Sequence, residues 1–163
     1  MMLTGLKYTL RHCGGISIAL CLLLSMASCN SDLIYHQYRH VSQTPWDTQD
    51  TISFNIDTIP ATGDYQLSVA LRTTAEIQYQ QIFLAVDCSL PHYSTRDTVS
   101  IILTDSEGEM QSNGIRLYNY STPLPRSLHL TRGQQAQVNI THLMRRTQLR
   151  GITDVGIKIG RED

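Results

Sequence analysis

Short runs in which apolar and polar residues alternate recur along this chain, and they constrain its fold more than any other feature. Because successive side chains of a β-strand point to opposite faces of a sheet, each run predicts a strand with one buried face. Pro60, Gly63 and Asp64 stand between two of the runs and predict a turn. The runs lie at 52–56, 65–71, 82–88, 99–103, 115–120, 128–130, 136–140 and 155–159. We therefore expect an all-β fold, a single antiparallel β-sandwich or jelly-roll-like domain of about eight or nine strands.

Length and composition agree with one such domain. The chain has 163 residues, of which 41% are hydrophobic and 17% charged, and one domain usually has about 100–200 residues. Its formal net charge of -1 excludes a strongly basic nucleic-acid-binding surface, so nucleic acid is not an expected partner.

One short helix is expected near the C-terminus. Thr141 can cap its first turn, residues 142–149 contain Leu143 and Met144, and Gly151 can end it. A helix of about two turns is too short to be stable alone, so it would have to dock onto the sheet.

The N-terminal residues predict export. Lys7 and Arg11 precede the apolar stretch 16–27, and no acidic residue occurs before Asp32. This order of charge and hydrophobicity is typical of a signal peptide. As a helix the apolar stretch would span roughly 18 Å, well short of the ~30 Å hydrocarbon core of a bilayer. We therefore expect residues 1–28 to be a signal peptide that is removed, and not a permanent transmembrane helix.

The segment Ser25-Met26-Ala27-Ser28-Cys29 resembles the bacterial lipobox, in which the cysteine becomes a lipid-modified N-terminus. By this resemblance Cys29 would carry a thioether-linked diacylglycerol and an acylated amine. The alternative is an ordinary secretory signal peptide that is cleaved nearby, with Cys29 incidental. On the lipoprotein interpretation, residues 29–50 are the lipidated N-terminus, a tether and the first strand, and residues 51–163 form the β-sandwich domain.

The cysteines and the charge of the mature chain fit this interpretation. Cys13 and Cys21 would leave with the signal peptide, so only Cys88 remains beside Cys29 and no internal disulfide can form. The apolar alternation around Cys88 predicts a buried side chain and not a reactive thiol. With 11 Lys and Arg against 14 Asp and Glu, the mature chain has a net charge of -3. Acyl chains, and not attraction to anionic lipid, would therefore hold it on a membrane.

Nearly the whole chain resembles the GldH family, which are gliding-motility lipoproteins of the Bacteroidetes. The residues that carry the resemblance are Trp46, Asp64-Tyr65-Gln66-Leu67, Leu71-Arg72, Tyr79, Ile82, Leu84, Asp97-Thr98, Asp105, Gly108, Gly114, Met144-Arg145, Leu149-Arg150-Gly151-Ile152 and Asp154-Val155-Gly156-Ile157. The chain departs from the family at Met110, where an aromatic residue would be expected. The resemblance therefore predicts no aromatic contact to a partner at that place.

The resemblance implies a lipid-anchored envelope protein that works with the gliding machinery and with the associated secretion system. It implies no catalytic residue and no cofactor. Family members also occur in bacteria that do not glide, so support of protein secretion is the more general role. A single acidic residue, Asp32, follows Cys29 closely, which is only a weak signal for the cell surface. We therefore expect the periplasmic face of the outer membrane, with other envelope proteins as partners.

Candidate sites for metal binding and catalysis are weak. His36, Tyr38 and His40 would share one face of a strand, but no third metal ligand is fixed by the sequence, so a solvated strand is expected instead. The loop 105–109 holds three acids without the spacing of an EF-hand, and predicts a polar hairpin turn. No phosphate-binding glycine loop, HExxH or GxSxG occurs. We expect no metal, no cofactor and no enzymatic activity.

Trp46, Tyr118, Tyr120 and Arg72 are the best candidates for a recognition surface. Exposed aromatic pairs can stack on sugar rings or anchor a protein partner. The alternative is that Trp46 and one tyrosine close the ends of the sandwich. Arg72 can equally pair with a carboxylate such as Asp64 or Asp97.

Three Asp-Thr-apolar segments, at 50–52, 57–59 and 97–99, resemble the pattern at which this phylum O-glycosylates exported proteins. They make Thr51, Thr58 and Thr98 possible modification sites, although so short a pattern also arises by chance. The sequence thus predicts a lipid-anchored, non-enzymatic component of a gliding or secretion assembly. The alternative is a carbohydrate-binding β-sandwich on an envelope lipoprotein.

Overall fold

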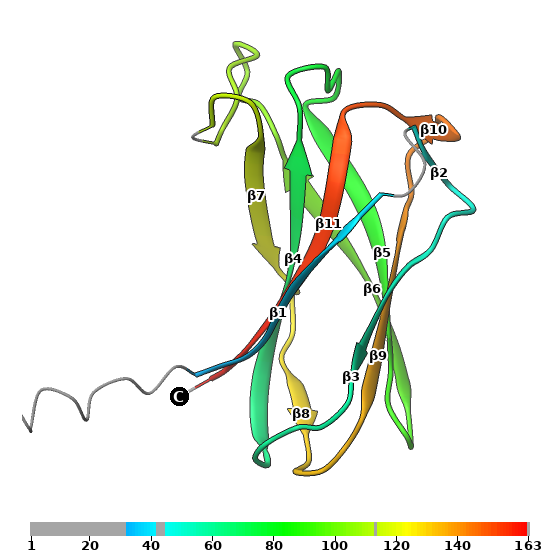
Figure 1. Cartoon of the computed structure of the whole chain (residues 1–163), viewed down its shortest axis with the longest axis vertical. Helices are drawn as coiled ribbons and strands as arrows, with labels where there is room; N and C mark the ends of the chain where they lie inside the picture. Colours follow the sequence, from blue (N-terminus) through cyan, green and yellow to red (C-terminus); the bar gives the residue numbers. More distant parts are fainter. Residues whose placement is uncertain (1–31, 42–44, 113, 163) are drawn as a thin grey trace, which may run out of the picture. The chain divides into compact units, whose positions relative to one another are not determined.

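The computed structural model describes residues 32–41, 45–112 and 114–162. All regular secondary structure within these residues is β-strand (Figure 1). The expected all-β fold is confirmed. The strands are β1 (Leu33–His40), β2 (Trp46–Asp47), β3 (Ile52–Ile56), β4 (Gly63–Thr73), β5 (Gln81–Ser89), β6 (Ser94–Ile102), β7 (Tyr118–Pro123), β8 (Leu128–Leu130), β9 (Ala136–His142), β10 (Gln148–Leu149) and β11 (Ile152–Arg161).

Two larger antiparallel sheets contain most of these strands. The five-stranded sheet has the order β1-β11-β4-β7, and β8 also pairs with β4. The pairs Leu71–Tyr120 and Tyr65–Leu128 show that β7 and β8 occupy the same edge of β4 one after the other. The four-stranded sheet has the order β3-β9-β5-β6, and β2 pairs with β10 in a small third sheet.

Alternation along the strands gives both sheets an apolar face. Phe54 in β3, Leu84 in β5 and Val138 in β9 are fully buried, as are Leu67 and Ile157 in the five-stranded sheet. These side chains belong to one hydrophobic cluster that draws on both sheets. Burial of this shared apolar surface is the main free energy that holds the fold together, because the described residues contain no disulfide.

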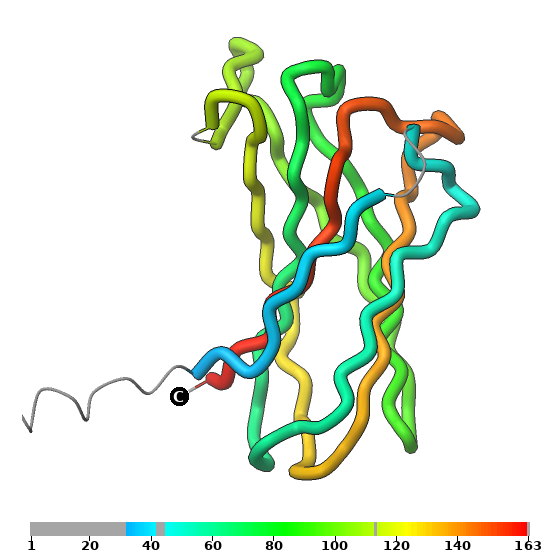
Figure 2. The backbone as a smooth tube through the Cα atoms, in the orientation of Figure 1, coloured from blue at the N-terminus to red at the C-terminus, as the bar shows by residue number. Residues whose placement is uncertain are grey.

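The strands of the five-stranded sheet define two ends of the structure. At one end Leu33 pairs with Gly160, and the backbone N–H of Arg161 donates to the carbonyl of Asp32 at 2.8 Å. Figure 2 shows β1 running beside β11 from this end. We call it the Leu33 end. Strand β4 begins at the Leu33 end, and its eleven residues extend about 33 Å to the opposite end of the sheet. Gly151 lies there, and we call it the Gly151 end.

The expected helix at 142–149 is wrong. His142 is the last residue of β9, and the backbone N–H of Leu143 donates to the carbonyl of Phe83 at 2.8 Å, which prolongs the pairing with β5. Leu143 is exposed while His142 is buried, so the side chains still alternate as in a strand. After a short turn the chain enters β10.

The expected strand at 115–117 is also wrong, because β7 begins only at Tyr118 and Ile115 is 97% exposed. The polar hairpin turn at 105–109 is confirmed. Its Asp105 carboxylate accepts hydrogen bonds from the backbone N–H groups of Glu107 and Glu109, both at 2.9 Å. The described residues include no helix with the length and hydrophobicity that crossing a bilayer requires.

Candidate functional site

Tyr38 lies across the outer face of the five-stranded sheet. It pairs with Gly156 of β11, which in turn pairs with Ala70 of β4. A Cβ atom on Gly156 would lie 2.6 Å from Cδ1 of Tyr38, so this close approach requires glycine. Ala70 is 2% exposed although it belongs to the outer row of β4. The outer face therefore has a small packed centre, in which the Tyr38 ring lies against Gly156 next to buried Ala70.

Arg72 extends this centre across the sheet. Its Cζ lies 3.8 Å from the centroid of the Tyr38 ring, a cation–π geometry, and its Nε donates to Oδ1 of Asn119 at 3.0 Å. The three side chains connect β1, β4 and β7, and we call them the Tyr38–Arg72–Asn119 row. Arg72 forms no ion pair with Asp64 or Asp97 among the described residues, so of the two alternatives left open by the sequence the carboxylate pair is absent.

His36 and His40 do lie on the same face of β1 as Tyr38. The ring centroids of His36 and Tyr38 are 5.5 Å apart, and Nδ1 of His40 is 3.5 Å from Oδ1 of Asp154. The described residues contain no group of three or more histidine, cysteine or acidic side chains that could hold a metal ion. The outer face is thus a polar surface of mixed charge organised around one aromatic ring.

Trp46 and Tyr120 point into the core. Trp46 is fully buried, and its indole Nε1 donates to the backbone carbonyl of Asp50 at 2.9 Å. Tyr120 is 6% exposed, and its hydroxyl donates to the sulfur of Met110 at 3.3 Å. Tyr118 is half-buried and packs against the same cluster. The expectation that Trp46 and Tyr120 form an exposed recognition surface is wrong, because both rings are buried, whereas Tyr118 and Arg72 remain partly exposed.

His142 packs beside Trp46 inside the structure. The two ring centroids are 5.2 Å apart in an edge-to-face arrangement, and His142 is 3% exposed. Burial lowers the pKa of His142 below its ordinary value of 6.5, because the low-dielectric interior disfavours the charged imidazolium.

We expect His142 to make the protein less stable in mild acid. Since the folded-state pKa is depressed, the unfolded chain binds the additional proton as the pH falls below about 6.5. The free energy of unfolding should therefore decrease from pH 7.5 to pH 5.5 more steeply in the wild type than in His142→Phe. Urea unfolding at both pH values measures this difference. Exposed His92 gives the matched control, His92→Phe, which makes the same replacement outside the core. Equal slopes in all three proteins would contradict the assignment.

Cys88 is buried, as its sequence context predicts. Burial first, and then the charge of nearby Asp97, raise the pKa of its thiol to about 11. Because the thiolate is the reactive form, this side chain is chemically inert at neutral pH.

A buried carboxylate links the two larger sheets, and the sequence analysis named this residue, Asp97, without predicting its burial or its pair with Arg126. Asp97 of β6 is 5% exposed, and its Oδ1 accepts from Nε and Nη2 of Arg126 at 2.9 and 2.6 Å. Arg126 lies in the connection between β7 and β8. The sequence did contain a sign of this burial. Asp97 alternates in step with Val99 and Ile101 and so lies on the buried face of the strand, where an apolar residue is expected.

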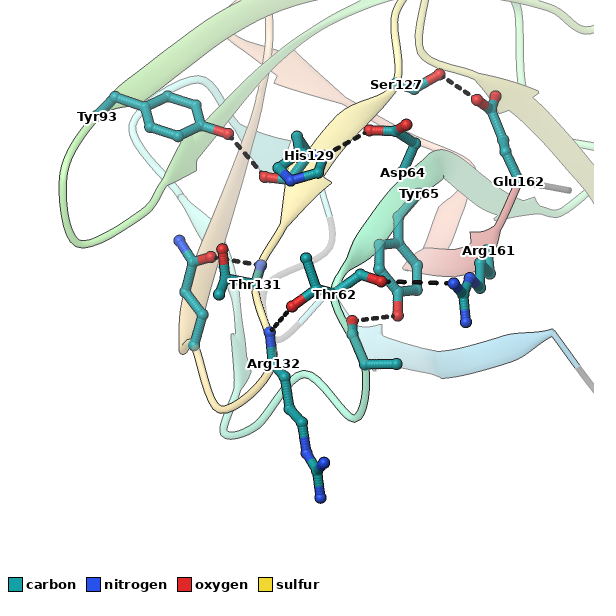
Figure 3. A network of polar contacts seen from close by, with 12 residues as sticks. Thr62, Asp64, Tyr65, Tyr93, Ser127, His129, Thr131, Arg132, Arg161 and Glu162 are labelled. Atoms are coloured by element: carbon teal, nitrogen blue, oxygen red, sulfur yellow. Dashed lines mark hydrogen bonds and ion pairs between the residues drawn. The ribbon is translucent and has the colours of Figure 1, made fainter.

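Polar contacts tie the loops together at the Leu33 end (Figure 3). Nδ1 of His129 lies 2.8 Å from Oδ1 of Asp64, and the hydroxyl of Tyr93 donates to the carbonyl of His129 at 3.2 Å. Ser127 donates to the carboxylate of Glu162 at 2.7 Å. The contacts join residues that are far apart in sequence but exposed to water, so they organise this end without adding much stability.

The remaining predicted sites are accessible or lie outside the described residues. Thr51, Thr58 and Thr98 are all exposed, as O-glycosylation would require. Cys29, the predicted lipid attachment site, and the signal peptide 1–28 lie outside the described residues.

Comparison with known proteins places the chain in a family. The GldH lipoprotein family model matches residues 33–159. The gliding motility lipoprotein GldH homolog of Christiangramia forsetii is 23% identical over 163 residues, covering 94% of this chain and 99% of that one. The gliding motility lipoprotein GldH of Flavobacterium johnsoniae is 24% identical over 153 residues, covering 90% and 96%. A solved structure of Eiger TNF from S. frugiperda aligns over 80% of this chain and 94% of that chain, with 10% identity and a TM-score of 0.36, and supports no argument.

The family match begins at the first residue of β1 and ends in β11, so it covers nearly all the strands just described. The chain belongs to the GldH family of gliding motility lipoproteins.

Proposed function

We propose that this protein is anchored by acyl chains on Cys29 to the periplasmic face of the outer membrane. There it acts as a non-enzymatic component of the gliding machinery and the associated secretion system. The observation that carries the proposal is the family match at Leu33, four residues after a cysteine that ends a lipobox-like segment.

This spacing supports a definite orientation. Four residue steps span at most about 14 Å, so lipid on Cys29 would keep the Leu33 end next to the membrane. The contacts between loops at that end would then lie near the membrane surface. Confinement to one membrane raises the effective concentration of the domain for partners on the same membrane, which is how a small protein without catalytic groups can support an assembly.

The Tyr38–Arg72–Asn119 row is the surface we propose for a partner. Only Nε of the Arg72 guanidinium has a hydrogen-bond partner among the described residues, which leaves four N–H donors for an incoming acceptor. Tyr38 and Asn119 fix the direction of the guanidinium in advance, so less side-chain entropy is lost on binding. The shared core of the two larger sheets supports the finer assignment of the fold as a β-sandwich.

A carbohydrate-binding function is not favoured. It required exposed aromatic faces at Trp46, Tyr118 and Tyr120, and the first and last of these are buried. Of these three residues only half-buried Tyr118 remains accessible, so the exposed aromatic pair that the prediction needed is absent.

Cys29→Ser should abolish lipidation and release the protein from membranes. A serine hydroxyl cannot form the thioether, so intact mass spectrometry should show the loss of all acyl mass, and fractionation should find the protein in the soluble periplasmic extract. Cys88→Ala is the matched control, because it removes the other thiol of the mature chain and should leave both the acyl mass and the membrane association unchanged.

The same pair of variants tests the assembly role. Crosslinking in cells should join the wild type and Cys88→Ala, but not Cys29→Ser, to components of the gliding or secretion apparatus. Unacylated wild-type protein would overturn the anchor, and an acylated protein that crosslinks only to abundant porins would overturn the assembly role.

A further inference from the structure

A basic hollow opens at the Gly151 end. It has a volume of about 950 Å³ and lies between residues 76–79, which follow β4, and residues 145–150, which include β10. None of the residues in the Tyr38–Arg72–Asn119 row lines it. Any ligand of this hollow is therefore separate from the partner surface proposed above, and from the lipid anchor.

Three arginines line the hollow. Arg145, Arg146 and Arg150 come from a six-residue segment, and in the described part of the chain none of their guanidinium groups has an ion pair or a hydrogen bond. The hollow contains one acidic side chain, Glu76, so its lining has a formal charge of +2 in a mature chain of net charge -3. Unpaired arginines gathered around one concave surface are suited to bind an anion, because each presents a planar fork of N–H donors.

The two walls of the hollow are fixed to each other. Thr74 donates its backbone N–H to the carbonyl of Gly151 at 2.8 Å, and a Cβ atom on Gly151 would lie 2.7 Å from the backbone nitrogen of Ile77. Beneath the walls, Ile77 and Leu149 are buried in the core. Thr48 also donates to the carbonyl of Thr147 at 2.8 Å, which holds the arginine segment on β2. The backbone that carries the arginines is therefore held in place without a ligand.

We propose that this hollow binds a phosphate monoester carried on a hydroxyl-rich group, such as a sugar phosphate. A phosphate monoester carries a charge of about −1.5 to −2 at neutral pH, which matches the formal charge of the lining. Neutral polar groups that exchange hydrogen bonds with hydroxyls complete the lining, namely Gln78, Tyr79, Thr147 and Gln148. A single carboxylate would neutralise only half of the charge, so it fits the hollow less well.

Calorimetric titration of the full-length protein in neutral detergent tests the proposal. The probes are glucose 6-phosphate, inorganic phosphate, glucose and glucuronate. Glucose 6-phosphate should bind at least 10-fold more tightly than glucuronate, inorganic phosphate should bind with intermediate affinity, and glucose should not bind. Higher salt should weaken the binding of both phosphates.

Matched variants locate the site. Arg145→Gln/Arg146→Gln/Arg150→Gln should weaken glucose 6-phosphate binding at least 10-fold, whereas neutralising three exposed cations elsewhere, in Arg116→Gln/Arg132→Gln/Lys158→Gln, should change it less than 2-fold. Glu76→Gln removes the only carboxylate of the lining and should tighten binding by about 2- to 5-fold. Far-ultraviolet circular dichroism checks that each variant retains its β structure.

The source of the phosphate is tested by competition with vesicles, using Cys29→Ser protein, because acyl chains on Cys29 would bind any vesicle. Vesicles that contain phosphatidic acid, a lipid phosphomonoester, should compete with glucose 6-phosphate if the ligand is a lipid head group, and should not compete if it is a soluble ester. Both results support the proposal. It is overturned if glucose 6-phosphate fails to bind, if both triple variants lose binding equally, or if glucuronate or an acidic peptide binds as tightly as the phosphates. None of these results depends on acylation of Cys29.

Discussion

Replacing Trp46 with alanine is expected to lower the free energy of unfolding by about 3–5 kcal/mol, the usual cost of emptying a buried aromatic site. The side chain is fully buried, contacts the edge of the His142 ring, and donates its indole N–H to Asp50. Trp46→Phe should lower the free energy of unfolding by less, because phenylalanine keeps most of the apolar contact and only the hydrogen bond to the Asp50 carbonyl is lost. Urea unfolding followed by circular dichroism measures both changes.

Tyr93→Ala is the control for this prediction. Tyr93 is 45% exposed and its hydroxyl bond lies at the surface, so its loss should cost less than about 1 kcal/mol. If Trp46→Ala were as stable as Tyr93→Ala, Trp46 would not be a core residue. The prediction that it belongs to a recognition surface would then be favoured again.

Gly151→Ala should destabilise the protein by about 2–5 kcal/mol. Gly151 has a φ of +85°, in the left-handed region that costs other residues about 1–2 kcal/mol. The new Cβ would also lie 2.7 Å from the backbone nitrogen of Ile77, and a collision with backbone that cannot rotate away costs about another 1–3 kcal/mol.

Gly133→Ala separates the two contributions. Gly133 has a similar φ of +78°, but a Cβ there would meet no atom within 4 Å. Its substitution should therefore cost only the conformational part, about 1–2 kcal/mol. The difference between the two variants in the same unfolding assay measures the contact between Gly151 and Ile77. Equal losses would mean that the two walls of the basic hollow are not held together by this approach.

Alternation in the sequence predicted most strands because each sheet has one buried face. The runs at 52–56, 65–71 and 82–88 fall within β3, β4 and β5, where side-chain period and burial coincide. Alternation gave a wrong strand where the apolar residues are exposed. Ile115 and Leu117 looked like a strand face, yet both are exposed.

The false helix at 142–149 has a different cause. Thr141 and Gly151 are helix-end residues in an isolated segment, but here Thr141 belongs to β9 and Gly151 forms a tight turn before β11. Local capping signals were outweighed by pairing with β5, a partner more than fifty residues away in sequence.

The contacts on the outer face could not be read from the sequence. Tyr38, Gly156 and Arg72 meet only because β1 pairs with β11 and β11 with β4, an order that alternation does not specify. The sequence indicated Arg72 as a candidate, but its neighbours Tyr38 and Asn119 lie on strands whose pairing with β4 or β11 it did not specify. Sequence reasoning also noted Gly156 as part of a family motif without finding that the Tyr38 ring requires the absence of a side chain there.

The pairing of β1 with β11 has a mechanical consequence for a protein held at Cys29. β1 is the edge strand that follows the proposed attachment point, and its residues pair with β11 from Leu33 to His40. Hydrogen bonds between antiparallel strands run perpendicular to the strand direction. A pull between the Leu33 end and a partner near the Gly151 end would be directed along β1 and would load these bonds in shear, sharing the force among them. With Cys29 as the anchor, the β1–β11 pairing would therefore resist tension along its strands, and it would separate one bond at a time only under a sideways force.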